Sequence, residues 1–179
     1  MNRFKWGTVA VWLLLFIGMA ANCAHVYAGP KAGDKAPDFV LENISDQKIS
    51  LKDSQGEIVV LIIGGRDAKD EMKKWEDFIG KEFNSGKPAV KLFSMAAIKQ
   101  PFFVPNSMVK TWIKKMNPPN FLLLDFGGKV AETYGVSNEE VPFLFVIDRG
   151  QVLCHTAASG CTETAREQIA GEVRRLLKQ

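Results

Sequence analysis

The fold is decided by the stretch Val141–Gly150, which reads VPFLFVIDRG. It is an apolar, β-rich run that begins at Pro142 and ends in a turn at Arg149-Gly150. A proline is tolerated at the first position of a strand, where its missing N–H removes no ladder hydrogen bond. A continuous apolar run of this length is typical of a strand that is buried on both faces. The stretch therefore predicts a buried strand that is entered through a special backbone step at Val141-Pro142.

The sequence around this strand predicts an alternation of strands and helices. The continuous apolar run at 58–63 predicts a second strand buried on both faces, and apolar residues recur at helical spacing from Met72 to Phe83. A turn at Asp46-Gln47 predicts an N-terminal hairpin within 36–51. Further strands are expected at 89–97, 121–125 and 152–155, and further helices at 105–116, 129–134 and 162–177. This order predicts an α/β fold with a central mixed sheet, helices on both faces and an N-terminal β-hairpin.

Four segments resemble the thioredoxin-like superfamily, and within it the redoxin branch of peroxiredoxins and TlpA-like exported thiol oxidoreductases. Ala36–Phe39 is similar to the redoxin entry strand, and Val59–Gly65 to the strand that delivers the active-site loop. Leu124–Val136 resembles a redoxin pattern of aspartate, glycine turn, short helix and Tyr-Gly-Val, and Val141–Gly150 resembles the cis-proline strand. The resemblance implies a thioredoxin-like fold over residues 29–179.

The resemblance also implies a redox-active Cys-x-x-Cys pair that faces a cis-proline at Pro142. The family positions of the two cysteines fall at Ala68 and Glu71, so neither is a cysteine in this chain. The Thr/Ser-x-x-Cys arrangement of a peroxiredoxin is also missing. A short similarity to YtfJ-like periplasmic proteins, in Gly65-Arg66 followed by Ala68-Lys69, points to a group with this fold that also lacks the pair.

Residues 1–28 have the layout of a secretory signal peptide. Arg3 and Lys5 precede an apolar run from Val9 to Ala21, and Val26-Tyr27-Ala28 provides small residues at a cleavage site. The apolar run is shorter than the about 20 residues of a membrane span, although an uncleaved anchor or a lipid on Cys23 remains an alternative. We therefore expect a periplasmic or secreted protein with no stable membrane span after cleavage.

The charge of the chain excludes one class of partner. Arg3 and Lys5 are the only charged residues of the predicted signal peptide, so of the net charge of +3 the remainder carries +1. Such a balance does not indicate a nucleic-acid partner. No cofactor motif is found, and a protein or peptide partner in the exported compartment is the expectation that remains.

The two cysteines outside the signal peptide, Cys154 and Cys161, are the candidate catalytic residues. Cys161 directly precedes the last predicted helix, whose dipole favours a thiolate, and in thioredoxin-like folds this loop lies beside the proline. A disulfide between Cys154 and Cys161 and two free thiols are both open interpretations. A metal site with His155 is not expected, because neighbouring residues of a strand point to opposite faces.

The charged residues of the helix near 70–83 have structural explanations. Carboxylates at a helix start, such as Asp67, Asp70 and Glu71, are expected for capping and for the helix dipole. Glu76 belongs to a run of alternating charges that predicts a solvated face. Trp112 is expected in the core or in the wall of a groove.

Two hypotheses for function follow. In the first, the protein is not an enzyme, and a groove formed by Val141, Pro142, Gly65 and Arg66 binds an extended segment of a partner protein. In the second, it is an atypical thiol-disulfide oxidoreductase or antioxidant redoxin that works through Cys161, with or without Cys154. A purely structural subunit is a third alternative.

Overall fold

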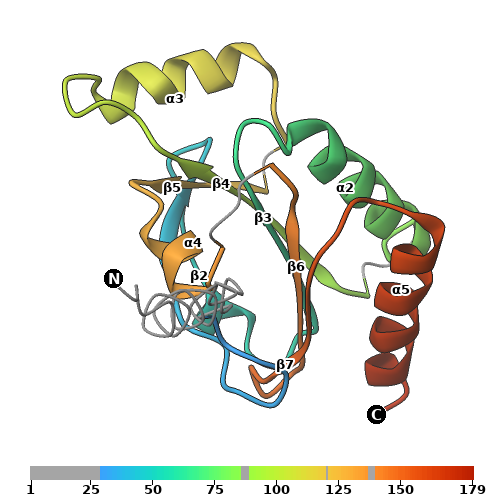
Figure 1. The fold of residues 1–179 in the computed structure, drawn as a ribbon. Helices are drawn as coiled ribbons and strands as arrows, with labels where there is room; N and C mark the ends of the chain where they lie inside the picture. The colour runs from blue at the N-terminus through green and yellow to red at the C-terminus, as the bar shows by residue number, and fades with distance from the viewer. Residues whose placement is uncertain (1–28, 86–88, 120, 137–139) are drawn as a thin grey trace, which may run out of the picture.

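Seven strands form one mixed sheet in this computed structural model (Figure 1). The structure describes residues 29–85, 89–119, 121–136 and 140–179, so the predicted signal peptide, 1–28, lies outside the described residues. The strands are β1 (Val40–Asn43), β2 (Lys48–Ser50), β3 (Val59–Gly64), β4 (Lys91–Ile98), β5 (Leu122–Phe126), β6 (Phe143–Ile147) and β7 (Leu153–Ala158). The helices are the 3₁₀ helix η2 (Leu51–Ser54) and the α-helices α2 (Lys69–Phe83), α3 (Asn106–Lys115), α4 (Lys129–Thr133) and α5 (Glu163–Leu177).

The sheet has the strand order β2-β1-β5-β4-β3-β6-β7. Strands β3, β4 and β5 are parallel, as strands connected by crossover helices must be. The pairs β3–β6, β6–β7, β1–β5 and β1–β2 are antiparallel. The mixed sheet and the N-terminal hairpin β1–β2 that the sequence predicts are therefore confirmed.

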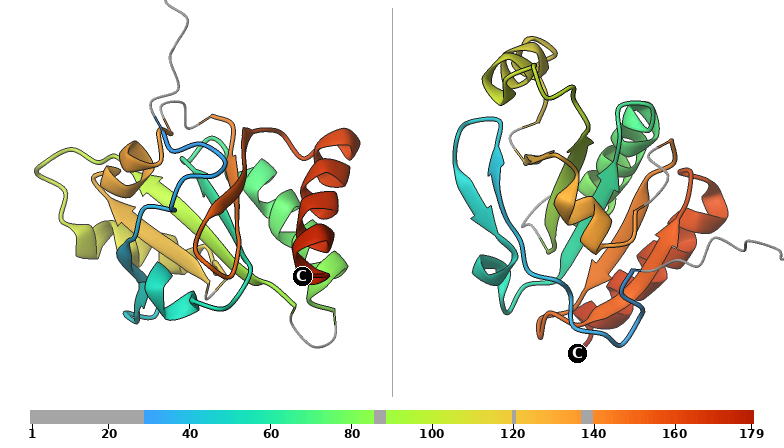
Figure 2. Two further views of the ribbon diagram at one scale, coloured as in Figure 1. Left: turned by 90° about the horizontal axis from the view of Figure 1, so that it is seen from below. Right: turned by 60° about the vertical axis from the view of Figure 1, so that its left-hand side comes forward.

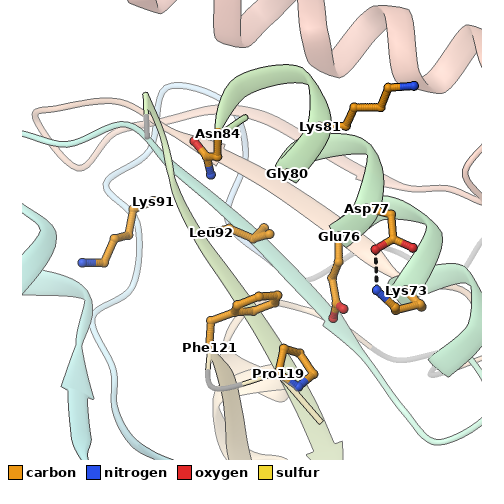
Figure 3. Close-up of a pocket in the computed structure, with 10 residues that line it drawn as sticks. All are labelled: Lys73, Glu76, Asp77, Gly80, Lys81, Asn84, Lys91, Leu92, Pro119 and Phe121. Carbon is orange, nitrogen blue, oxygen red and sulfur yellow. Dashed lines mark hydrogen bonds and ion pairs between the residues drawn. The ribbon is translucent and has the colours of Figure 1, made fainter. Parts of the chain in front are cut away.

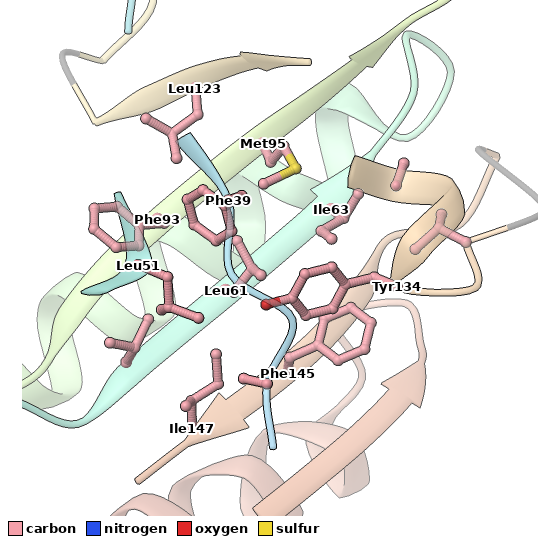
Figure 4. Close-up of a cluster of buried hydrophobic side chains, with 14 of the residues drawn as sticks. Phe39, Leu51, Leu61, Ile63, Phe93, Met95, Leu123, Tyr134, Phe145 and Ile147 are labelled. Atoms are coloured by element: carbon pink, nitrogen blue, oxygen red, sulfur yellow. The ribbon is translucent and has the colours of Figure 1, made fainter. Parts of the chain in front are cut away.

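Helices cover both faces of the sheet, also as predicted (Figure 2). Helices α2 and α5 pack together on one face, where Trp75, Ile79 and Ile169 belong to one buried cluster. On the other face, α4, η2 and the segment before β1 enclose a second buried cluster that includes Phe39 and Tyr134. Figure 4 shows this second cluster, in which the Tyr134 and Phe145 rings meet edge to face with centroids 4.9 Å apart.

The burial of β3 on both faces explains why residues 58–63 form an uninterrupted apolar run. Its successive side chains alternate between the two clusters, with Leu61 and Ile63 on the α4 side and Val60 and Ile62 on the α2 side. All four are fully buried. Each such side chain contributes about 1.5–3 kcal/mol of hydrophobic stabilisation, so this strand anchors both layers and fixes where its carboxyl end lies.

The Val141–Pro142 step differs from the prediction. No cis peptide bond occurs among the described residues, so this bond is trans. The trans form is the default for an Xaa–Pro bond by about 0.5–1 kcal/mol. Here it lets the Pro142 carbonyl accept a hydrogen bond from the Ser159 N–H at 3.0 Å, which extends the β6–β7 pairing by one residue beyond the strands.

Candidate functional site

Three loops meet at the end of the sheet where β3 ends and β6 begins. In the antiparallel register, Ile63 lies opposite Phe143, and Phe143 lies opposite Ala158. The chain on either side of these pairs forms what we call the Pro142 rim: residues 65–68, 140–142 and 159–161. Gly65 and Arg66 directly follow β3, and Val141 and Pro142 directly precede β6, so the predicted groove residues lie in the loops at this end of the sheet.

The rim carries one stretch of backbone without a partner. Among the described residues, no hydrogen bond reaches the N–H or the C=O of Val141, and its side chain is exposed. Pro142, by contrast, is buried and its carbonyl is already bonded to Ser159. Arg66 extends into solvent with 93% of its side chain exposed, and its ion pair is with the adjacent Asp67.

The position of the first family cysteine is closed by packing. Ala68 is fully buried and is the residue at which α2 begins. A Cβ added to Gly64 would lie 3.0 Å from the Ala68 Cβ and 2.7 Å from the Met72 Sδ, so the end of β3 and the first turn of α2 are in tight contact. No side-chain hydrogen bond caps α2, which corrects the expectation of a capping aspartate. Ala68 adopts helical angles, which explains the absence of a cap.

The position of the second family cysteine holds a carboxylate that binds the opposite loop. Glu71 Oε2 accepts a hydrogen bond from the Cys161 backbone N–H at 2.8 Å, and Oε1 pairs with the Lys74 ammonium at 2.5 Å. Both contacts lower the pKa of the Glu71 carboxyl, the Lys74 contact most. Glu71 is therefore an ionised acceptor that links α2 to the loop before α5, and it holds no transferable proton at neutral pH.

Cys161 is half-buried at this link. Its Sγ accepts a hydrogen bond from the Arg166 Nε at 3.1 Å, and the Arg166 guanidinium lies over the Phe78 ring at 5.6 Å from the centroid. The N-terminus of α5 follows directly, capped by the Thr162 side chain, which accepts from the Ala165 N–H. A cationic donor and a helix N-terminus are both features that stabilise negative charge on sulfur.

Cys154 lies far from this arrangement, so the two cysteines are free thiols. The charged groups around Cys154 include Glu172 and Arg175 in the last turns of α5, whereas Cys161 contacts Arg166 near the beginning of that helix. At about 1.5 Å per residue the two neighbourhoods are roughly 9–14 Å apart along α5, beyond the about 7 Å that a disulfide spans. Strand β7 causes this separation, because it carries Cys154 to the far end of the helix.

The surroundings of Cys154 also differ in character. Burial raises the pKa of the Cys154 thiol, and the neighbouring Asp148 and Glu172 carboxylates add to this. Burial lowers the pKa of the adjacent His155 imidazole. Among the described residues no group of three or more His, Cys, Asp or Glu side chains is placed to hold a metal ion.

A pocket of ≈ 630 Å³ lies elsewhere, between α2, β4 and the segment before β5 (Figure 3). Glu76 enters it from α2 and is only 8% exposed, and burial raises the pKa of its carboxyl. The prediction of a solvated face is therefore wrong at Glu76. Its spacing of four residues from the buried Met72 is the sequence signal that could have placed it inward. None of the predicted site residues lines this pocket.

Sequence reasoning missed two further residues of the site. Arg166 lies one turn beyond the start of α5 and therefore reaches back to Cys161. The Trp75 indole N–H donates to the Ser159 carbonyl at 3.0 Å, so this buried side chain connects α2 to the rim. Trp112, expected in the core or a groove wall, is instead 53% exposed.

The sheet, the two helices on one face and the proline-led rim define a protein of thioredoxin-like fold, and its sequence contains no Cys-x-x-Cys pair. A model of the AhpC/TSA family matches residues 32–156. The chain belongs to the AhpC/TSA family.

Relatives and solved structures agree with this assignment. The chain is 29% identical over 141 residues to the thiol-disulfide oxidoreductase ResA of Bacillus thuringiensis subsp. konkukian (strain 97-27), which covers 76% of each protein. It resembles the solution structure of a putative protein disulfide isomerase from Bacteroides thetaiotaomicron, with a TM-score of 0.65, 18% identity and coverage of 83% and 91% of the two chains. It also resembles the pneumococcal exposed lipoprotein thioredoxin Etrx1 from Streptococcus pneumoniae strain TIGR4, with a TM-score of 0.60, 22% identity and coverage of 76% and 99%. At these identities the two solved structures support the fold.

Across the described part of the chain, no helix combines the length and the apolar composition that a membrane crossing requires.

Proposed function

We propose that this protein works outside the cytoplasm and binds an extended segment of a partner protein at the Pro142 rim, without a dithiol of its own. The observation that supports the proposal is the backbone of Val141, whose N–H and C=O have no hydrogen-bond partner among the described residues. An extended peptide can add to such a backbone as a further strand, with main-chain hydrogen bonds for affinity. Secretion follows from the predicted signal peptide at 1–28.

The substitutions at the family cysteine positions favour binding over redox chemistry at this end of α2. A buried methyl group at Ala68 and an ionised carboxylate at Glu71 cannot form a disulfide. The Glu71–Cys161 hydrogen bond holds two walls of the rim together, which gives a partner segment a preformed surface. Arg66 adds an exposed cation at one side, suited to an acidic residue of the partner.

A photo-crosslinking experiment tests this proposal. A benzoylphenylalanine at position 141 is expected to give discrete protein adducts in cells that export the chain, and the Arg66→Glu variant is expected to weaken them. The matched control carries the same group at position 40, since Val40 is also an exposed valine but lies on β1, outside the rim. Adducts that are equally abundant at both positions, or none at position 141, would count against the rim as a binding site.

A second candidate function is thiol-disulfide exchange by Cys161 alone, and the Arg166 Nε–Cys161 Sγ contact of 3.1 Å favours it. In this reaction the Cys161 thiolate attacks a partner disulfide, forms a mixed disulfide and releases the other partner sulfur as a thiolate. Trapping of mixed disulfides, with assays of insulin and peroxide reduction, tests it. Adducts should disappear in Cys161→Ser and persist in Cys154→Ser. Crosslinks at position 141 without any mixed disulfide would support binding at the rim and eliminate exchange.

A further inference from the structure

One region of the surface is unusually rich in large apolar side chains. Of the large hydrophobic side chains that are exposed among the described residues, most belong to residues between 102 and 116, although this segment is a small part of the chain. Phe102 is 100% exposed, and its ring contacts that of Phe103 with the centroids 5.6 Å apart. Three more exposed apolar side chains follow on α3 and at its end. We call this set the α3 face, and its members are Phe102, Phe103, Met108, Trp112 and Met116.

The α3 face is presented outward by its attachment to the hairpin. Helix α3 stands apart from α2 and α5 at one end of the sheet (Figure 1). On its inner side, Lys110 is buried and pairs with Glu42 at 3.3 Å and with Asp46 at 2.5 Å. These ion pairs orient the helix, and Met108 and Trp112, four residues apart, therefore share an exposed stripe on its other side.

The charge of this region is of one sign. Residues 95–124 contain four lysines and no aspartate or glutamate, although the whole chain has 23 Lys+Arg and 20 Asp+Glu. Lys110 and Lys114 are paired with the hairpin carboxylates, and Lys115 lies beside Trp112 on the exposed side with no ion pair in the described structure. The outward surface therefore combines aromatic and thioether side chains with uncompensated positive charge.

We propose that the α3 face binds the surface of an anionic phospholipid bilayer. A short helix with tryptophan, phenylalanine and methionine on one side and lysines at its flank is the chemistry of an interfacial anchor. Aromatic rings partition at the headgroup level, and each lysine near an anionic surface adds attraction. Segment 95–124 itself carries no carboxylate, and the neighbouring Glu42 and Asp46 are paired with Lys110 and Lys114. The face shares no residue with the Pro142 rim, so the two proposals can be tested separately.

The test uses the full chain with vesicles of phosphatidylcholine, with or without phosphatidylglycerol. Residues 1–28 contain an apolar run of their own, so the readout has to report on α3 itself. Quenching of Trp112 fluorescence by brominated lipids does so when it is taken as the difference between the wild-type chain and Trp112→Phe. We expect strong quenching in phosphatidylglycerol vesicles, little in phosphatidylcholine vesicles, and a loss of this contrast at about 0.5 M salt.

Two variants and a control decide the outcome. Phe102→Ser with Phe103→Ser should abolish Trp112 quenching, and Lys115→Glu should lower vesicle affinity roughly fivefold or more. Val40→Ser removes an exposed apolar side chain on β1 and should change nothing. Equal Trp112 quenching in both lipids, or in the Phe102/Phe103 variant, overturns the proposal. The proposal is also overturned if Trp112 is not quenched and the chain binds a soluble protein that the Phe102→Ser/Phe103→Ser variant no longer binds. That result would assign the face to a protein interface.

Discussion

Two strand-to-helix junctions of this protein face each other across the Pro142 rim, and they carry different side chains. The β3–α2 junction has the position of the family redox site but offers a buried Ala68 and an ionised Glu71. The β7–α5 junction has no such role in the resemblance, yet it holds Cys161 next to a guanidinium donor. The junctions are joined by the Glu71–Cys161 and Trp75–Ser159 hydrogen bonds.

The difference shows that the scaffold and the thiol chemistry are separable. The first junction retains the tight contact of Gly64 with Ala68 and Met72, which serves packing whether or not a cysteine is present. The second junction has a side-chain N-cap and a sulfur beside a cation, which are local features of α5. The Cys161 thiol therefore lies at the β7–α5 junction, whereas the sequence of the β3–α2 junction contains no cysteine.

The largest expected effect comes from breaking the connection between the junctions at Trp75. Trp75→Ala should lower the free energy of unfolding by about 3–5 kcal/mol, because it removes a fully buried aromatic side chain. Trp75→Phe keeps most of the packing and should cost clearly less, mainly the hydrogen bond to the Ser159 carbonyl. Denaturant titration of both variants measures these losses. If the two variants lose equal free energy of unfolding, the difference in buried side-chain volume between them does not determine the cost.

The next largest effect is expected in the alkylation rates of the two thiols, Cys154 and Cys161. Burial raises the pKa of the Cys154 thiol, so less of it is thiolate at pH 7 and iodoacetamide should modify Cys154 more slowly than Cys161. Arg166→Gln should slow the modification of Cys161. Arg174→Gln is the matched control, since Arg174 lies on the same helix and pairs with Glu82. Mass spectrometry of timed samples measures both rates, and a faster Cys154 would contradict the assignment.

Substitutions at the N-cap residues of α2 and α5 should change the free energy of unfolding differently. Thr162→Ala should lower the free energy of unfolding by about 1 kcal/mol, because the Ala165 N–H loses its side-chain acceptor. Ala68→Ser at the corresponding place of α2 should bring no gain, since Ala68 has helical angles and is buried. Thermal unfolding of the two variants checks this. A stabilised Ala68→Ser variant would mean that the first junction can be capped after all.

The smallest effect is expected at Glu76, on the side of α2 away from Cys161. Burial raises the pKa of this carboxyl in the folded protein above its ordinary value of 4.5. Ionisation above that pH therefore costs the folded state more than the unfolded state, and stability falls as pH rises through this range. Glu76→Gln should be more stable than the wild type at pH 7, and the gain should vanish below about pH 4.5. Denaturant midpoints across pH measure it, with the exposed Asp77→Asn as the control.

The elements of the fold could be predicted because their signals are local. The apolar run at 58–63 gave β3 within one residue, and the apolar spacing from Met72 to Phe83 gave α2. The threonine before the last apolar stripe gave the start of α5. In each case the residues that carry the signal are neighbours in sequence, so periodicity and capping suffice.

The candidate site could be predicted only in part, because its contacts join distant residues. Glu71 and Cys161 are 90 positions apart, and no pattern near either residue indicates their hydrogen bond. The separation of Cys154 from Cys161 depends on how β7 lies along α5, which the six intervening residues do not reveal. The exposure of Trp112 arises because α3 attaches to the hairpin through Lys110, so its apolar stripe faces outward.

The sequence by itself determined the class of fold, the absence of a Cys-x-x-Cys motif, and the identity of the two thiols outside the predicted signal peptide. Only the tertiary structure decided that Val141-Pro142 is trans, that Glu71 binds the opposite wall, and that Cys161 stands alone beside Arg166. The physical reason is the sequence separation of the residues that carry each feature. Burial patterns and helix starts are written in adjacent residues, whereas a site is set by packing between elements that the chain brings together only when it folds.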